Sequence, residues 1–259
     1  MKLICLNLWG GKLVEPLLEF VKRKGEEADI FCFQEALQTS GEAPALKSGA
    51  RADIFDVLQK ALPDFQGYFD KNEEGWDFGE PVSFPLAIGQ ASFVKKGLEV
   101  RTHEHIPIVE TPSGRAEDPS DRPRALQHLE ISAPGGEPFH TFNFHGLLDD
   151  GHKRDTEKRL NQLNRVRCIV EKAGNRAILC GDFNTRPETK GIAMFREKMS
   201  DLVDKFGMPQ TRSHWYATRD KYEDYWGDYI FTTDGIKVNN FAVPKDIISD
   251  HMPLWLDFD

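Results

Sequence analysis

The stretch that decides the fold is Ala177-Ile178-Leu179-Cys180-Gly181-Asp182-Phe183-Asn184. Its apolar run followed by glycine predicts a short buried strand that ends in a turn carrying a carboxylate and an amide. In layered α/β proteins, chemistry is usually placed at the carboxyl ends of such strands. Because Asp182 and Asn184 lie two residues apart, extended geometry would point both side chains the same way. An ordinary turn of Gly, Asp and Asn explains this stretch equally well on its own.

Length and composition favour one large soluble domain. The chain has 259 residues, of which 39% are hydrophobic, and no linker, repeat or low-complexity tract divides it. We therefore expect residues 1–259 to form a single domain, although length alone also admits two small ones. The net charge of -9 argues against broad binding to a phosphate backbone, which needs a basic surface. It leaves room for a metal-dependent phosphoesterase, because a bound divalent cation reverses the local charge.

The cysteines and the amino terminus bear on the compartment. Cys5, Cys32, Cys168 and Cys180 show no zinc-binding spacing and no disulfide framework, so buried free thiols are expected. The first apolar run is too short for a secretory signal, and no stretch approaches membrane-spanning length. We expect a cytoplasmic protein without membrane contact and without an evident protein partner.

Apolar runs and helical periodicity alternate along the chain. Strands are predicted at residues 2–8, 29–34, 86–94, 98–108, 123–131, 138–144, 177–180, 227–231, 236–243 and 253–258, and helices at residues 13–24, 53–62, 156–172 and 187–199. This pattern predicts two sheets packed face to face with helices outside. We expect three pairs of consecutive strands: 86–94 with 98–108, 123–131 with 138–144, and 227–231 with 236–243.

Two glycine-rich or irregular segments are expected to be exposed loops, at residues 70–79 and 111–121. In the first, Trp76 and Phe78 either form a lip that faces the substrate or cover the core. We favour the cover, because aromatic side chains are usually packed.

Eight polar side chains share one property, which is a position at or near the end of a predicted strand. They are Asn7, Glu35, His145, Asp182, Asn184, Asp228, Asp250 and His251. Singly, each has an ordinary explanation as a turn residue, a solvated strand end or a buried histidine. Together they predict one site, and a right-handed crossover would bring Asn7 and Glu35 close to each other.

The motifs around these residues occur in a characteristic order. They are LNLWG at Asn7, FQE at Glu35, NFHG at His145, GDFN at Asp182 and Asn184, GDYIF at Asp228 and SDH at Asp250 and His251. The set resembles the endonuclease/exonuclease/phosphatase superfamily, whose fold is deoxyribonuclease I-like. The resemblance implies an α/β fold, namely a four-layer α/β sandwich of two packed mixed β-sheets flanked by helices. It also implies metal-dependent phosphoester hydrolysis.

A phosphoester is anionic and resists attack by water, so the site must neutralise charge and orient water. We expect Mg²⁺, with Mn²⁺ as a substitute, to be held by Glu35, Asn7 and Asp250. Asp182 would orient or deprotonate the attacking water, and Asn184 would donate a hydrogen bond to the phosphoryl oxygen.

Two histidines complete the predicted catalytic set. His251, held in one tautomer by Asp228, would contact the phosphate or relay a proton. His145 would contact the phosphate or protonate the leaving oxygen.

The expected function is phosphodiester cleavage by water attack on phosphorus, with a nucleic acid or nucleotide as the substrate. The alternatives are a phosphatase of a small metabolite or inositol phosphate, and a catalytically silent binding module on the same fold. Cationic candidates for a second phosphate contact are Arg115, Arg122, Arg124, Lys153, Arg154 and Arg159. A solvated charge cluster explains them equally well.

Overall fold

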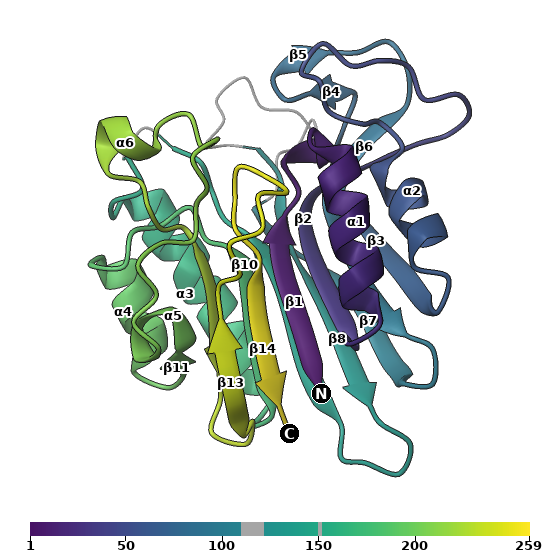
Figure 1. The fold of residues 1–259 in the computed structure, drawn as a ribbon. Helices are drawn as coiled ribbons and strands as arrows, with labels where there is room; N and C mark the ends of the chain where they lie inside the picture. The colour runs from purple at the N-terminus through teal and green to yellow at the C-terminus, as the bar shows by residue number, and fades with distance from the viewer. Residues whose placement is uncertain (110–121, 150–151) are drawn as a thin grey trace.

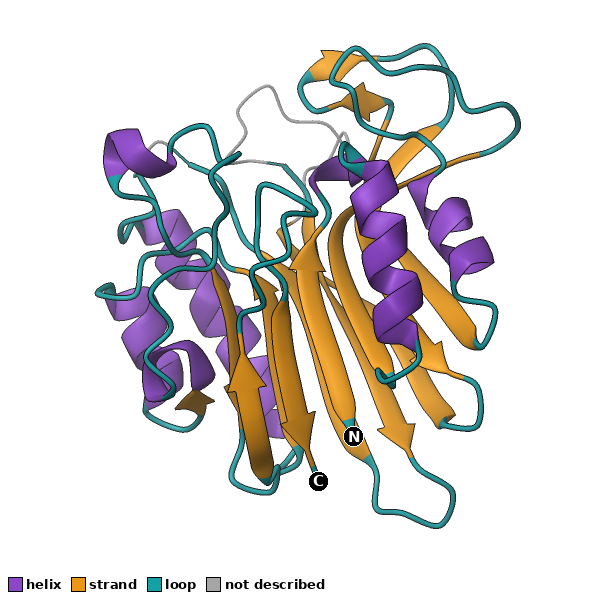
Figure 2. Ribbon diagram, viewed as in Figure 1, coloured by secondary structure: helices purple, strands orange, loops and turns teal. Residues whose placement is uncertain are grey.

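The computed structural model describes residues 1–109, 122–149 and 152–259, which form two six-stranded mixed sheets packed face to face (Figures 1 and 2). The first has the order β13-β14-β1-β2-β6-β3 and the second the order β11-β12-β10-β9-β8-β7. Helices cover the outer faces, so the predicted fold class is confirmed. The segment expected as a loop at residues 111–121, with Arg115, lies outside the described residues.

The first sheet consists of β1 (Lys2–Asn7), β2 (Ile30–Thr39), β3 (Phe65–Glu74), β6 (Leu86–Lys95), β13 (Val238–Ala242) and β14 (Leu254–Phe258). The second consists of β7 (Glu99–Val109), β8 (Arg124–Ser132), β9 (Phe139–His145), β10 (Ala177–Asp182), β11 (Ser200–Asp201) and β12 (Asp228–Thr232). A separate two-stranded ribbon is formed by β4 (Trp76–Asp77) and β5 (Glu80–Pro81).

The helices are η1 (Trp9–Gly11), α1 (Val14–Gly25), α2 (Ile54–Ala61), α3 (Glu157–Lys172), α4 (Lys190–Arg196), α5 (Leu202–Lys205) and α6 (Arg219–Tyr222). The first sheet is covered by α1 and α2, while α3, α4 and α5 lie against the second (Figure 2). Thr156 begins α3, the clearest helix of the sequence, by accepting a hydrogen bond from the Arg159 backbone N–H. Among the described helices, none is long and apolar enough to cross a membrane.

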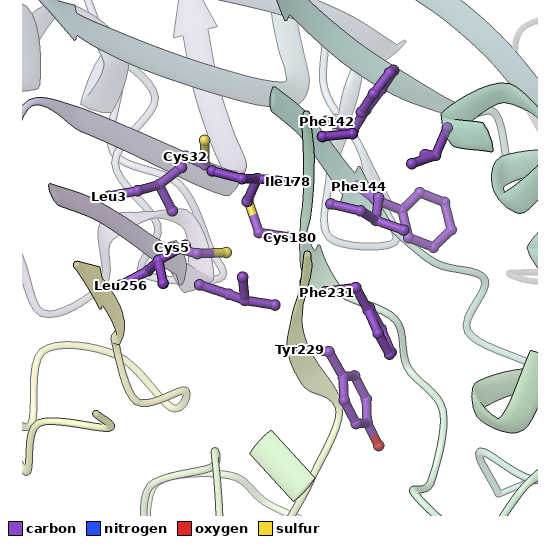
Figure 3. Packing of buried hydrophobic residues seen from close by; sticks show 14 of the residues in the cluster. Leu3, Cys5, Cys32, Phe142, Phe144, Ile178, Cys180, Tyr229, Phe231 and Leu256 are labelled. Atoms are coloured by element: carbon purple, nitrogen blue, oxygen red, sulfur yellow. The ribbon is translucent and has the colours of Figure 1, made fainter. Parts of the chain in front are cut away.

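Alternating side chains of β2 supply two cores at once. Phe31 and Phe33 point to the helices, whereas Cys32 points to the second sheet. Between the sheets, Cys5 and Cys32 face Cys180 of β10 (Figure 3). These three thiols are buried and free, and Cys168 is free and partly buried, as expected apart from the incomplete burial of Cys168.

Two of the three predicted pairings of consecutive strands are wrong, and in both cases the chain changes sheet between the two strands. The turn at Gly97 passes between the sheets, so that β6 pairs with β2 and β3 while β7 pairs with β8. Likewise, β13 pairs with β14, and β12 pairs with β10. The physical reason is burial. Because β6 is buried over most of its length, its backbone N–H and C=O groups find hydrogen-bond partners only when it lies between two other strands. The predicted β8–β9 pair is confirmed.

Residues 70–79 are largely not a loop. They hold the end of β3, which runs to Glu74, and the short strand β4. Phe78, with a left-handed φ of 47°, packs against the buried cluster under the first sheet.

Candidate active site

The eight predicted side chains meet at one end of the sandwich, where both sheets contribute strand ends. The parallel β1–β2 pair places Asn7 opposite Gln34, next to Glu35. In the second sheet, Asp182 lies opposite His145 on one side and opposite Asp228 on the other. The Ser249 hydroxyl donates to the Asn7 carbonyl at 2.7 Å and joins the segment that carries Asp250 and His251 to β1.

A cavity of about 360 Å³ opens at this end. Six of the eight predicted residues line it, namely Glu35, His145, Asp182, Asn184, Asp250 and His251. Asn7 and Asp228 are buried and contact the lining residues: the Asn7 amide nitrogen lies 3.3 Å from Asp182 Oδ2, and Asp228 Oδ1 lies 2.8 Å from His251 Nδ1. The whole predicted set is therefore one connected group.

The sequence predicts Glu35 at the end of a strand, and this is wrong. Glu35 lies at an irregularity inside β2. The register with β6 shifts between Phe33 and Ala36, and Glu35 has a φ of 53°. A bulge of this kind re-aims a side chain that regular pleating would send elsewhere. The strained backbone is therefore the local cause of a carboxylate that lines the cavity.

Asp182 and Asn184 are not aligned by extended geometry, which corrects the expectation for this motif. Asn184 has a φ of 50°, and its backbone N–H donates to Asp182 Oδ1 at 2.9 Å. The two side chains converge because the chain turns, with Asp182 stabilising the turn.

His251 and Asp228 form the expected pair. His251 Nδ1 donates to Asp228 Oδ1 at 2.8 Å, and the Thr211 hydroxyl donates to Asp228 Oδ2 at 2.9 Å. Burial opposes charging of the imidazole, but Asp228 and Asp250 outweigh it and raise the pKa of His251 to about 9. The ring is thus a cation at neutral pH, with Nε2 lying 3.7 Å from Asp182 Oδ2.

Among the carboxylates of the site, Asp182 accepts the most hydrogen bonds from protein groups. Besides the Asn184 backbone, it accepts from Asn7 Nδ2 at 3.3 Å and from Arg212 Nη2 at 3.3 Å. Burial alone would raise its pKa, but His251 and Arg212 prevail and hold the pKa of Asp182 well below its usual range.

Unlike Asp182, the carboxylates of Glu35 and Asp250 have no arginine neighbour that forms an ion pair with them among the described residues. Burial, and then the nearby Asp250, raises the pKa of Glu35 to about 7. In the part of the chain that the structure describes, no lysine or arginine forms an ion pair with either carboxylate. Glu35 Oε1 lies 3.7 Å from His145 Nε2, and Asp250 Oδ1 lies 3.8 Å from His251 Nε2. Buried oxygen ligands that repel each other fit a hard divalent cation.

The other possible metal ligands have partners already. Asp182, Asp228 and His251 offer three ligand atoms within 4.8 Å of one another, but His251 Nδ1 donates to Asp228. The Asn7 side-chain oxygen accepts from the Trp9 N–H at 2.9 Å, so Asn7 also braces the turn after β1. Glu35 and Asp250 are thus the freest oxygen donors of the group.

His145 is a neutral base in this setting. Burial, and then Arg124, lowers the pKa of His145 to about 3. Of its two expected roles, hydrogen bonding to a phosphate suits this ring better than protonating a leaving oxygen.

Sequence reasoning missed two residues of the site, Arg212 and Tyr216. Arg212 is fully buried, and the Tyr216 ring, which lines the cavity, lies 3.9 Å from its guanidinium carbon. Both belong to residues 211–226, which lack strand or helix periodicity and so gave no geometric signal. Their aromatic and basic composition was the only available indication.

The cationic candidates separate into two groups. Arg122 and Arg124 line the cavity, as does Phe78, which therefore serves both as core cover and as cavity wall. Lys153 is buried and donates to the Tyr216 hydroxyl at 2.6 Å, and Arg159 is buried against Asp149.

Comparison with known proteins places this geometry in context. The model of the Endonuclease/Exonuclease/phosphatase family matches residues 4–251. The mannosyl-6-phosphatase of Bacteroides thetaiotaomicron VPI-5482 is 17% identical, with a TM-score of 0.71 over 100% of this chain and 99% of its own. D. rerio TDP2, humanized by 14 mutations, is 16% identical, with a TM-score of 0.67 over 100% of this chain and 98% of its own.

The catalytic domain of human Nocturnin, with bound sulfate, is 17% identical, with a TM-score of 0.71 over 100% of this chain and 94% of its own. At such identities the likeness shows the fold alone. No curated protein matches the sequence.

Proposed function

Because the chain belongs to the endonuclease/exonuclease/phosphatase family, we propose that it hydrolyses a phosphoester with the help of one or more divalent ions, Mg²⁺ in the first place. Members of this family are phosphoric ester hydrolases and generally depend on divalent metals. The observation that carries the proposal is that Glu35 and Asp250, which have no lysine or arginine partner among the described residues, lie at one cavity with Asp182 and with the hydrogen-bonded pair of His251 and Asp228.

Glu35 and Asp250 would hold the ion, with Asn7 beside them. When bound, the ion polarises a phosphoryl oxygen and neutralises its charge. Asp182, kept ionised by its neighbours, would accept a hydrogen bond from the attacking water and orient it toward phosphorus. Its depressed pKa makes it a weak base, so orientation is the larger part of its role.

The remaining side chains act on the phosphate. The Asn184 side-chain oxygen accepts from Arg212 Nη2 at 3.4 Å, and its amide nitrogen donates one hydrogen to the Gly146 carbonyl at 3.4 Å, which leaves the second amide hydrogen for the phosphate. His251 as an imidazolium would stabilise the charge that develops on the phosphoryl oxygens. Neutral His145, whose Nε2 lies 3.7 Å from Glu35 Oε1, would hydrogen-bond to the phosphate.

The preferred substrate class is a nucleotide or nucleic-acid phosphodiester, with aromatic side chains of Trp9, Phe78 and Tyr216 in the cavity wall to stack on a base. A small phosphorylated metabolite is the second candidate. The cavity of about 360 Å³ is the size of a single small ligand, and the net charge of -9 disfavours a long polyanion. A structural relative is named as a mannosyl-6-phosphatase.

The test is hydrolysis of a panel with Mg²⁺, Mn²⁺ or EDTA. The panel contains single-stranded and abasic DNA, RNA, 5′-phosphotyrosyl DNA, inositol phosphates, sugar 6-phosphates and bis(p-nitrophenyl) phosphate. We expect cleavage of at least one member that EDTA abolishes and that Asp182→Asn and His251→Ala greatly reduce. Cleavage that survives EDTA and both substitutions would refute the proposal. Tight binding of a member without turnover would favour the silent module instead.

A further inference from the structure

We propose that the guanidinium of Arg212 takes the place of a second metal ion, so that the site binds a single divalent ion, at Glu35 and Asp250. The inference rests on the proposed function for the location of that ion. Arg212 is here a positioning residue, which acts on the phosphate through Asp182 and Asn184.

Arg212 Nη2 occupies a point on which two oxygens converge. It lies 3.3 Å from Asp182 Oδ1 and 3.4 Å from Asn184 Oδ1. A carboxylate and an amide oxygen that face one point are ligands that a hard divalent ion would take. In this chain an arginine nitrogen holds that point.

The guanidinium is held between close neighbours. The Tyr216 ring lies on it at 3.9 Å, and the backbone of Gly227 lies so close that a Cβ at position 227 would stand 2.1 Å from Nη2. Only glycine admits this approach, because real Cβ contacts essentially never fall below 3.0 Å. Arg212 therefore cannot yield to an ion without rearranging the segment that carries it.

The guanidinium is kept there at a cost. Nε and Nη1 are buried and have no hydrogen-bond partner among the described residues. Unpaired buried donors are destabilising, so packing alone does not account for a charged side chain here. Its Nη2 contacts with Asp182 and Asn184 supply the reason.

Hydrogen bonds also occupy the oxygens that a second ion would need. Asp182 Oδ2 accepts from Asn7, and the two Asp228 oxygens accept from His251 and Thr211. By contrast, Glu35 and Asp250 have no arginine or lysine partner in the described part of the chain. One ion at those two carboxylates completes the site.

The experiment counts bound Mn²⁺ on the whole protein, by isothermal titration and by the electron paramagnetic resonance signal of free Mn²⁺. We expect about one tight ion per chain in the wild type, none in Glu35→Gln and one in Arg212→Lys, which keeps the charge. Arg212→Met should free the Asp182 and Asn184 oxygens and bind a second ion. Gly227→Ala, which displaces the guanidinium without removing it, should do the same.

Two tight ions in the wild type would overturn the inference, whatever the variants do. A folded Arg212→Met and a folded Gly227→Ala that both keep one ion of wild-type affinity would overturn it as well, and would leave Arg212 as a brace of the loop. Circular dichroism of each variant establishes folding, and the Gly227→Ala count stands if Arg212→Met does not fold. If the protein binds one ion but hydrolyses no substrate, the proposed function is refuted, while the inference of one ion per chain still holds.

Discussion

The two halves of the active site treat buried negative charge in opposite ways. The Asp182 half comprises Asp182, Asp228, His251 and Arg212, and the Glu35 half comprises Glu35 and Asp250. In the Asp182 half every carboxylate oxygen meets a protein donor. In the Glu35 half the carboxylates face each other with no arginine or lysine ion pair among the described residues. The comparison shows which buried carboxylates have hydrogen-bond donors on every oxygen and which are left without a lysine or arginine partner among the described residues.

The sharpest way to separate the halves is to remove one carboxylate from each. We expect Glu35→Gln to abolish both ion binding and turnover, whereas Asp182→Asn should lower kcat on the order of 10³-fold and leave one ion bound. The measurements are kcat for the panel substrate that is cleaved fastest, and the number of bound ions from the Mn²⁺ titration. The exposed Glu26→Gln is the matched control. Loss of the ion in Asp182→Asn, with Glu35→Gln still binding it, would reverse the assignment of the two halves.

Smaller effects are expected within the Asp182 half, where Thr211 donates to Asp228 and His251 donates to Asp228. Asp228→Asn removes the negative partner of His251 Nδ1 and should lower kcat about 10²-fold. Thr211→Val removes only the hydroxyl that donates to Asp228 Oδ2 and should cost roughly 10-fold or less. The pH profile of kcat is the second readout, since the high pKa of His251 depends on Asp228 before the other carboxylates. Equal losses with unchanged profiles would speak against His251 as the charged partner.

The Glu35 half should reveal itself in the stability of the metal-free protein. The folded-state pKa of Glu35 is raised from 4.5 to about 7, so folding binds this proton more tightly. Stability therefore falls as pH rises through that window. Glu35→Gln lacks this loss, and relative to it the wild type should lose on the order of 3 kcal/mol between about pH 4 and pH 8. Urea unfolding of both proteins in EDTA measures the difference. A constant difference across pH would show that Glu35 is not strained by burial and Asp250.

The smallest expected effect concerns Arg122, a cavity residue that belongs to neither half. Arg122 lines the wall and is partly exposed beside Glu73. Arg122→Ala should raise KM by about 3- to 10-fold for substrates with a second anionic group and leave kcat unchanged. Arg154→Ala is the control, because Arg154 is exposed and does not line the cavity. An equal change of KM in both variants would indicate a general charge effect.

The sequence predicts this site well wherever a regular strand carries the residue. His145 and Asp182 end neighbouring parallel strands, so their meeting follows from register alone. Glu35 reaches the cavity through a bulge, which apolar alternation does not encode. Arg212 sits in irregular chain, and its place depends on a glycine that follows it by fifteen residues.

The errors in strand pairing have the same origin. Alternation tells which side chains of β6 and β7 are buried, and it says nothing of the partner strand. The turn at Gly97 closes a hairpin in sequence but joins two different sheets in space. Whether two consecutive strands pair with each other or lie in different sheets is decided only by the packing of the complete sandwich.

The bond from Ser249 to the Asn7 carbonyl, and the place of β1 between β14 and β2, have a consequence for biosynthesis. Ser249 is translated 242 residues after Asn7, which takes about 10–50 s at ordinary rates of elongation. Until β14 is made, one edge of β1 has no partner strand, and from the synthesis of Asp182 onward Asn7, Glu35 and Asp182 exist without Asp250 and His251. A nascent chain at that stage therefore holds most of the candidate site but lacks one of the two carboxylates proposed to bind the ion.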